Sequence, residues 1–105
     1  MSHPLISKVE EKVKSAPVVI FMKGTPQFPQ CGFSARACQA LKRVGAESLV
    51  GVDVLSDDQL WDALEEYTKW PTVPQIFIHG KFVGGCDIVC EMLENGELET
   101  LVKQA

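Results

Sequence analysis

Residues 18–44 read VVIFMKGTPQFPQCGFSARACQALKRV, and three different patterns follow one another in this stretch. The run Val18–Met22 is wholly apolar, which is typical of a strand covered on both faces of a sheet. The next residues are rich in proline and glycine and predict a loop. From Phe33 to Gly45 the spacing predicts a helix that ends at the glycine, with one apolar face made of Phe33, Ala37, Cys38, Leu41 and Val44. The stretch therefore predicts strand, loop and helix, with Cys31 where the loop enters the helix.

The elements expected in the rest of the chain complete a mixed sheet between layers of helices. In chain order they are a helix over Leu5–Ser15, a strand over Leu49–Val54, a helix to about Thr68 that starts at the capping-box pair Ser56 and Gln59, a hairpin over 74–83, a helix capped by Cys86 or Asp87 and ending at Leu93, and a helix over Glu97–Lys103. A parallel βαβ unit followed by an antiparallel ββα unit is the α/β arrangement of the thioredoxin fold. We expect one domain over residues 1–105, with a four-stranded mixed sheet flanked by helices.

The composition limits the class of partner. A net charge of −4 without a basic patch gives no expectation of nucleic acid binding. No apolar run approaches the roughly 18–20 residues that a membrane-spanning helix needs, so we expect no membrane association. The four cysteines occur without a secretory signal pattern, in a chain long enough to bury a core without disulfides. This favours a reducing compartment, and the cysteine spacing does not match a paired C-x2-C zinc site.

Cys31 is the candidate reactive group. At the start of a helix, free backbone N–H groups and the positive end of the helix dipole favour thiolate over thiol, and Lys23 at the start of the loop adds a cation. A second cysteine three residues further on would close a local disulfide, but that position is Ser34. Cys31 must therefore react with an external thiol, a distant cysteine or a metal.

The other three cysteines have different expected roles. Cys38 and Cys90 fall on apolar helix faces and are expected in the core. Cys86 follows Gly84-Gly85 at a helix start and is expected to be accessible, either as a structural cap or in a redox or ligand-contact role. We also consider the hypothesis that Cys31 and Cys86 lie close enough to form an occasional disulfide.

The turn Thr72-Val73-Pro74 precedes the third strand. A cis bond before Pro74 would leave the backbone N–H and C=O of Val73 free. These groups would then pair with an extended, peptide-like ligand in the manner of an added strand.

Four motifs in order and spacing closely resemble the CGFS-type monothiol glutaredoxins. The matching segments are Lys23–Pro26 with Pro29, Cys31–Ser34, Trp70–Gln75 and Gly84–Asp87, and the resemblance covers nearly the whole chain. It implies a thioredoxin fold with Val73–Pro74 cis. It also implies a glutathione site made of Lys23, Thr72, Val73 and Pro74, with Cys86 and Asp87 at the γ-glutamyl end.

The resemblance further implies an iron–sulfur role. In members that carry iron, Cys31 and the glutathione sulfur ligate a [2Fe–2S] cluster that two protein chains and two glutathiones share. Such a protein is a homodimer with the cluster and a monomer without it. It passes the cluster to iron–sulfur acceptor proteins in iron–sulfur protein biogenesis.

One departure from the family pattern concerns the far end of the ligand. The family usually has an arginine nine residues before Trp70, where it contacts the glycine carboxylate of glutathione, and often a lysine four residues later. Here these positions are Trp61 and Glu65, so the carboxylate loses a bidentate partner. Either Lys23 or Lys69 compensates, or the physiological thiol is a glutathione conjugate with a blocked carboxylate, such as trypanothione.

Three functions are weighed. The first is a cluster carrier. The second is a glutathione-dependent thiol–disulfide oxidoreductase, in which Cys31 attacks a mixed disulfide and a second thiol releases it. The third is a non-catalytic binding module, which the motifs disfavour because an inert module needs neither Cys31 nor its loop. The resemblance to the family favours the carrier, with weak or no activity on small disulfides. Single-domain members of the family are often mitochondrial, so we expect the mitochondrial matrix, with the cytoplasm as the alternative.

Overall fold

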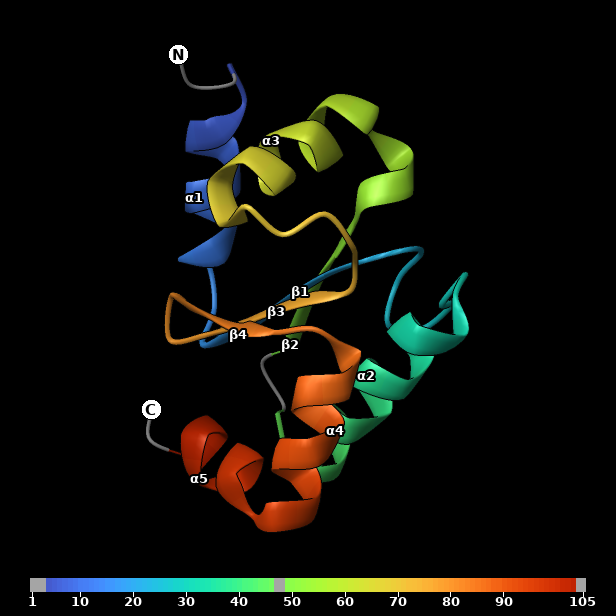
Figure 1. Cartoon of the computed structure of the whole chain (residues 1–105), viewed down its shortest axis with the longest axis vertical. Coiled ribbons are helices and arrows are strands. Elements are labelled where there is room, and N and C mark those ends of the chain that lie inside the picture. The colour runs from blue at the N-terminus through green and yellow to red at the C-terminus, as the bar shows by residue number, and fades with distance from the viewer. Residues whose placement is uncertain (1–3, 47–48, 104–105) are drawn as a thin grey trace.

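In the computed structural model, which describes residues 4–46 and 49–103, the strands form one mixed sheet in the order β2-β1-β3-β4 (Figure 1). The bounds are β1 Val18–Met22, β2 Leu49–Asp53, β3 Gln75–Ile78 and β4 Lys81–Gly84. β1 pairs parallel with β2 and antiparallel with β3, and β3 pairs antiparallel with β4. The predicted thioredoxin fold is therefore confirmed.

The helices cover both faces of this sheet. Their bounds are α1 Ile6–Val13, α2 Gly32–Arg43, α3 Asp58–Thr68, α4 Cys86–Asn95 and α5 Glu97–Lys103. Figure 1 shows α1 and α3 on one side of the sheet and α2, α4 and α5 on the other. Every residue of β1 is buried, with Val18, Ile20 and Met22 in the α2 and α4 core and Val19 and Phe21 in the α1 and α3 core. The apolar run thus forms a central strand, as predicted.

Two helix starts differ from the sequence prediction. α3 is capped by Asp57, whose Oδ1 accepts hydrogen bonds from the N–H groups of Gln59 and Leu60 at 3.0 and 3.3 Å. Ser56 lies in a short 3₁₀ helix, because the chain makes one further turn after β2 before α3 begins. α4 begins at Cys86 behind an N-cap Gly85 that makes no side-chain hydrogen bond, so neither Cys86 nor Asp87 is the cap.

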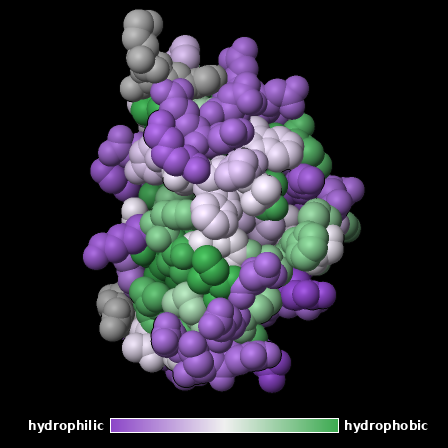
Figure 2. Space-filling model, in the orientation of Figure 1, coloured by the Kyte–Doolittle hydropathy of each residue, from purple (hydrophilic) through white to green (hydrophobic). Residues whose placement is uncertain are grey.

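The surface differs between the two helix layers. Figure 2 shows mostly hydrophilic atoms over α1 and α3 and a hydrophobic patch at the level of β4 and just below it, whereas the end where α4 meets α5 is again mostly hydrophilic. Phe33 was expected on the apolar face of α2, but 58% of it is exposed, because the first turn of α2 borders an open pocket. No helix in the described ranges is long and apolar enough to cross a membrane.

Candidate functional site

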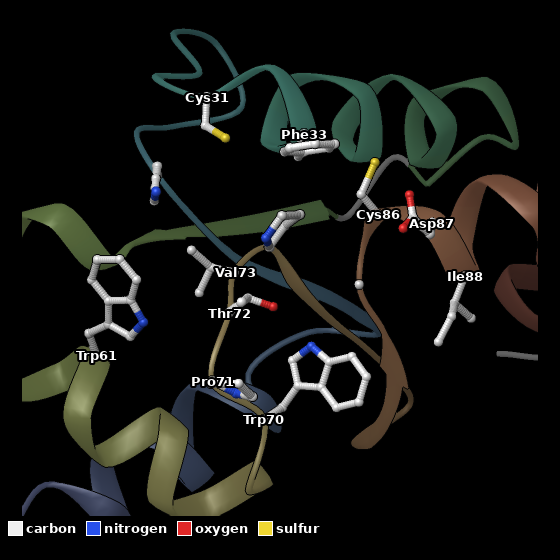
Figure 3. Close-up of a pocket in the computed structure, with 13 residues that line it drawn as sticks. Cys31, Phe33, Trp61, Trp70, Pro71, Thr72, Val73, Cys86, Asp87 and Ile88 are labelled. Carbon is white, nitrogen blue, oxygen red and sulfur yellow. The ribbon is translucent and has the colours of Figure 1, made fainter.

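A pocket of about 570 Å³ lies where the N-termini of α2 and α4 face the segment that joins α3 to β3. Every residue predicted for the site lines it: Lys23, Cys31, Thr72, Val73, Pro74, Cys86 and Asp87. Phe33, Trp61, Trp70 and Ile88 add apolar walls. Figure 3 shows the Cys31 sulfur directed into the space above Val73, and Cys86 at the start of α4 with its sulfur directed towards α2. Segments far apart in sequence thus converge on one thiol.

Cys31 is the N-cap residue of α2 and is partly exposed. The backbone N–H of Ser34 lowers the pKa of the Cys31 thiol, helped by the N–H of Phe33 and the charge of Lys23, while partial burial works in the opposite direction. These are the free N–H groups of a helix start, as the sequence predicted. The arrangement gives a nucleophilic or metal-ligating thiolate at the pocket.

Ser34 does more than replace a second cysteine. It is fully buried, and its Oγ accepts a hydrogen bond from the backbone N–H of Lys23 at 3.2 Å. The hydroxyl therefore ties the first turn of α2 to the residue that follows β1. Sequence reasoning considered Ser34 only as a missing thiol and missed this contact.

The loop before Cys31 is held at its base. Gly24 has φ +87°, and a Cβ there would lie 2.5 Å from the carbonyl oxygen of Phe28 and 2.7 Å from the nitrogen of Gln30. Asp53, at the end of β2, accepts hydrogen bonds at 2.9 Å from the N–H groups of Gly24 and Leu55. The sequence did carry a signal for Asp53, because it ends the strand predicted to run parallel beside Val18–Met22.

The wall opposite Cys31 presents free backbone groups. The Val73–Pro74 bond is cis, as the resemblance implied. Among the described residues, no protein group pairs with the backbone N–H or C=O of Val73. The buried amide of Gln75 donates to the carbonyl oxygens of Trp70 and Thr72, both at 2.9 Å, and so fixes this segment from behind. Gln75 was part of the sequence motif, but its bracing role was not predicted.

Cys86 corrects the sequence prediction of an accessible thiol, since only 6% of it is exposed. Gly84 and Gly85 let α4 start close against the sheet, and a Cβ on Gly85 would lie 3.3 Å from the carbonyl oxygen of Pro74. Burial raises the pKa of the Cys86 thiol to about 11, and the neighbouring Cys90 thiol adds to this effect. Cys86 is thus a protonated thiol set into the pocket wall.

The remaining cysteine predictions have separate outcomes. Cys38 is buried, with its Sγ 3.5 Å from the Sδ of Met22, so the core prediction is confirmed. Cys90 is only partly buried and packs at the edge of the α2 and α4 core. All four cysteines are free thiols here, and the Cys31–Cys86 disulfide stays a prediction.

Trp61 occupies the position where the family resemblance places an arginine. Its ring lines the pocket, and the Nζ of Lys23 lies 5.6 Å from the ring centroid, within cation–π range. Lys69 was considered as a compensating cation, but it is not among the described residues that line this pocket. Lys69 is the C-cap residue of α3, with a left-handed backbone at φ 60°. Lys23 is thus the cationic side chain of the described pocket lining.

Comparison with known proteins places these features in one family. The Glutaredoxin family model matches residues 18–83. Glutaredoxin 4 of Buchnera aphidicola is 48% identical over 96% of this chain and 94% of its own length, and the mitochondrial monothiol glutaredoxin-5 of Schizosaccharomyces pombe is 47% identical over 91% and 67%. The crystal structure of a buckwheat glutaredoxin–glutathione complex superposes with a TM-score of 0.83 at 30% identity, over 94% of this chain and 87% of that one. The chain therefore belongs to the glutaredoxin family, as a monothiol member with the CGFS sequence at residues 31–34.

Proposed function

We propose that this chain, as one glutaredoxin domain over residues 1–105, carries a [2Fe–2S] cluster as cargo and transfers it to iron–sulfur acceptor proteins. The observation that carries the proposal is Cys31, a thiol of lowered pKa at an open pocket, with Ser34 where a local disulfide partner would stand. A thiolate without such a partner is free to ligate iron.

The number of ligands supports sharing of the cluster. A [2Fe–2S] cluster takes four thiolates. In the described part of the chain, no three His, Cys, Asp or Glu side chains lie close enough to hold a metal ion together. Two chains and two small thiols would supply the four sulfurs, so the cluster-bound form is a homodimer and the cluster-free form a monomer.

The pocket suits glutathione or a closely related thiol. The free backbone of Val73 would pair with the cysteinyl part of the tripeptide, beside Thr72 and Pro74. Lys23 would hold the glycine carboxylate. Asp87 and the N-terminal turn of α4 would bind the ammonium and carboxylate of the γ-glutamyl end. The buckwheat relative, whose structure is a glutathione complex, supports this assignment.

The identity of the physiological thiol turns on Trp61. The apolar ring leaves Lys23 as the cation for a carboxylate in the described pocket lining. A glutathione conjugate with a blocked glycine carboxylate, such as trypanothione, needs no further cation and has apolar surface to lay on the ring. Titration of both thiols during cluster assembly tests this point, and a clear preference for plain glutathione would defeat the conjugate.

Monothiol oxidoreduction is the second candidate function. The lowered pKa of Cys31 favours it, because a thiolate attacks a glutathione mixed disulfide directly. Cys31 would take the glutathione, the target thiol would leave, and a second glutathione would free Cys31. The same pocket serves both functions.

Anaerobic reconstitution with iron, sulfide and glutathione separates the two. A brown dimer with a visible charge-transfer spectrum, lost in Cys31→Ser but kept in the matched control Cys38→Ser, supports the carrier. A colourless monomer that rapidly reduces mixed disulfides supports the enzyme instead. We propose the mitochondrial matrix as its compartment, which the mitochondrial relative from Schizosaccharomyces pombe supports, with the cytoplasm as the alternative because another relative is bacterial.

A further inference from the structure

Two cysteine thiols meet on the first turns of α4, at the edge of the pocket. The Sγ atoms of Cys86 and Cys90 lie 3.9 Å apart. Cys86 lines the pocket, whereas Cys90 is not among the described lining residues and is partly exposed. We propose that Cys86 and Cys90 form a second thiol–disulfide exchange site, in which Cys90 resolves a mixed disulfide at Cys86. The proposal rests on the proposed function only in requiring that the pocket admits a small thiol or its disulfide.

The exchange balances with a small disulfide, such as glutathione disulfide, as the oxidant. The Cys86 thiolate attacks this disulfide, a Cys86–glutathione bond forms, and one glutathione leaves as thiolate. The Cys90 thiolate then attacks the Cys86 sulfur, the bond to glutathione breaks, and the second glutathione leaves. The two protein thiols are oxidised to one disulfide, two glutathiones are the reduced products, and these take up the two protons that the cysteines lost.

The positions of the three sulfurs suit this second step. Exchange proceeds by attack on a disulfide sulfur from the side opposite the leaving sulfur. A thiol bonded to Cys86 would lie in the pocket that Cys86 lines. The Cys90 sulfur contacts the Cys86 sulfur at 3.9 Å, and Cys90 is not among the described residues that line the pocket, so it can reach Cys86 without occupying the space of the bound thiol. A disulfide between Cys31 and Cys86 would be opened in the same way, with Cys31 as the leaving thiolate.

The helix must adjust to close the Cys86–Cys90 bond. The Cβ atoms of residues four apart on a helix are about 5–6 Å apart, whereas a disulfide needs roughly 3.5–4.5 Å. Cys86 is the first residue of α4, and the glycine pair before it, with Gly84 at φ +149°, can absorb the shift. A bond closed under such strain is easily reduced, which suits exchange rather than a permanent cross-link.

Tryptic peptides give a direct test. Lys81 and Lys103 bound a peptide that holds both Cys86 and Cys90, whereas Cys31 falls in the peptide 24–36. The reduced chain is incubated anaerobically at mildly alkaline pH, where a small fraction of Cys86 is thiolate, with rising ratios of glutathione disulfide to glutathione until the distribution no longer changes. It is then unfolded in denaturant, so that every remaining thiol is accessible, blocked with an alkylating agent and digested. We expect the peptide 82–103 to appear unalkylated and lighter by two hydrogen atoms, in the wild type, in Cys31→Ser and in the control Cys38→Ser.

Cys90→Ser gives the kinetic arm. With the resolving thiol removed, a glutathione adduct at Cys86 should persist at least about tenfold longer than in the wild type, because the intramolecular attack is lost. A peptide 82–103 that stays doubly alkylated at every ratio, or an adduct lifetime equal in both proteins, overturns the proposal. Cluster reconstitution in Cys90→Ser should match the wild type, so failure of cluster binding and failure of this exchange site are read separately.

Discussion

The hydroxyl oxygen of Ser34 accepts the backbone N–H of Lys23 at 3.2 Å, and this bond joins the start of α2 to the end of β1. The position where a dithiol protein would carry its second cysteine is therefore structural here. It fixes the backbone on both sides of the loop that presents Cys31.

Ser34→Ala should lower the free energy of unfolding by about 1–2 kcal/mol, because the Lys23 N–H loses its partner in a part-buried place. It should also raise the pKa of Cys31, since the Ser34 side chain contributes to keeping that pKa low. Denaturant unfolding and the ultraviolet absorbance of the thiolate against pH measure the two effects. Ser15→Ala removes an exposed hydroxyl that donates a hydrogen bond to the carbonyl oxygen of Lys12, and this control should change neither. Equal destabilisation in both variants would count against the assigned role.

The thiols should react with iodoacetamide in a fixed order as pH rises. The alkylating species is the thiolate, so a lowered pKa makes Cys31 reactive at lower pH than an ordinary cysteine. Cys86, with its pKa raised to about 11, should stay largely unmodified until strongly alkaline pH. Fragment-ion mass spectrometry after timed alkylation gives both profiles, from the peptide 24–36 for Cys31 (15–36 in Lys23→Met, which loses that cleavage site) and from the peptide 82–103, whose fragments separate Cys86 from Cys90. Lys23→Met should shift the Cys31 profile to higher pH, Lys23→Arg should not, and a Cys86 profile that coincides with that of Cys31 would contradict the burial argument.

Gly24→Ala should be costly for two separable reasons. The left-handed backbone at φ +87° costs an alanine about 1–2 kcal/mol. The added Cβ would also press on the carbonyl oxygen of Phe28, 2.5 Å away. Gly45→Ala is the matched control, because Gly45 has φ +81° and open space around the added Cβ. We expect Gly24→Ala to reduce the free energy of unfolding by at least about 1 kcal/mol more than the control does. Equal losses would show that the loop moves aside without cost.

Trp61→Arg should strengthen the binding of glutathione to the cluster-free chain about tenfold, because a charge-assisted hydrogen bond to the glycine carboxylate adds at least about 1.5 kcal/mol. Isothermal titration calorimetry measures the change. Trp61→Phe keeps an aromatic wall without adding charge and should give no gain. A gain in Trp61→Phe as large as in Trp61→Arg would mean that the bulk of Trp61, and not a missing cation, limits affinity.

The sequence predicted the sheet because its strongest signals are local. The apolar run Val18–Met22 could be stable only as a strand covered on both faces, and the helix that follows it set the parallel pairing with Leu49–Asp53. The motif resemblance predicted that the site residues lie together, and the residues that line the pocket agree with this prediction.

What the sequence missed depends on distances between elements. Helical periodicity put Phe33 on the inner face of α2, but it does not report that no neighbouring element covers the first turn. The glycines before Cys86 suggested openness, yet they let α4 approach the sheet and bury the thiol. The hydrogen bonds made by Ser34 and Asp53 cross between segments 11 and 29 residues apart, beyond the reach of local patterns.

The buried amide of Gln75, which holds the carbonyls of Trp70 and Thr72, has a consequence for the thermodynamics of binding. A wall that is braced from the core before a thiol arrives loses little conformational entropy when the thiol docks. The entropic cost of association then falls on the ligand, a flexible peptide, and not on the protein. A more rigid thiol should gain affinity on this surface with no new contact.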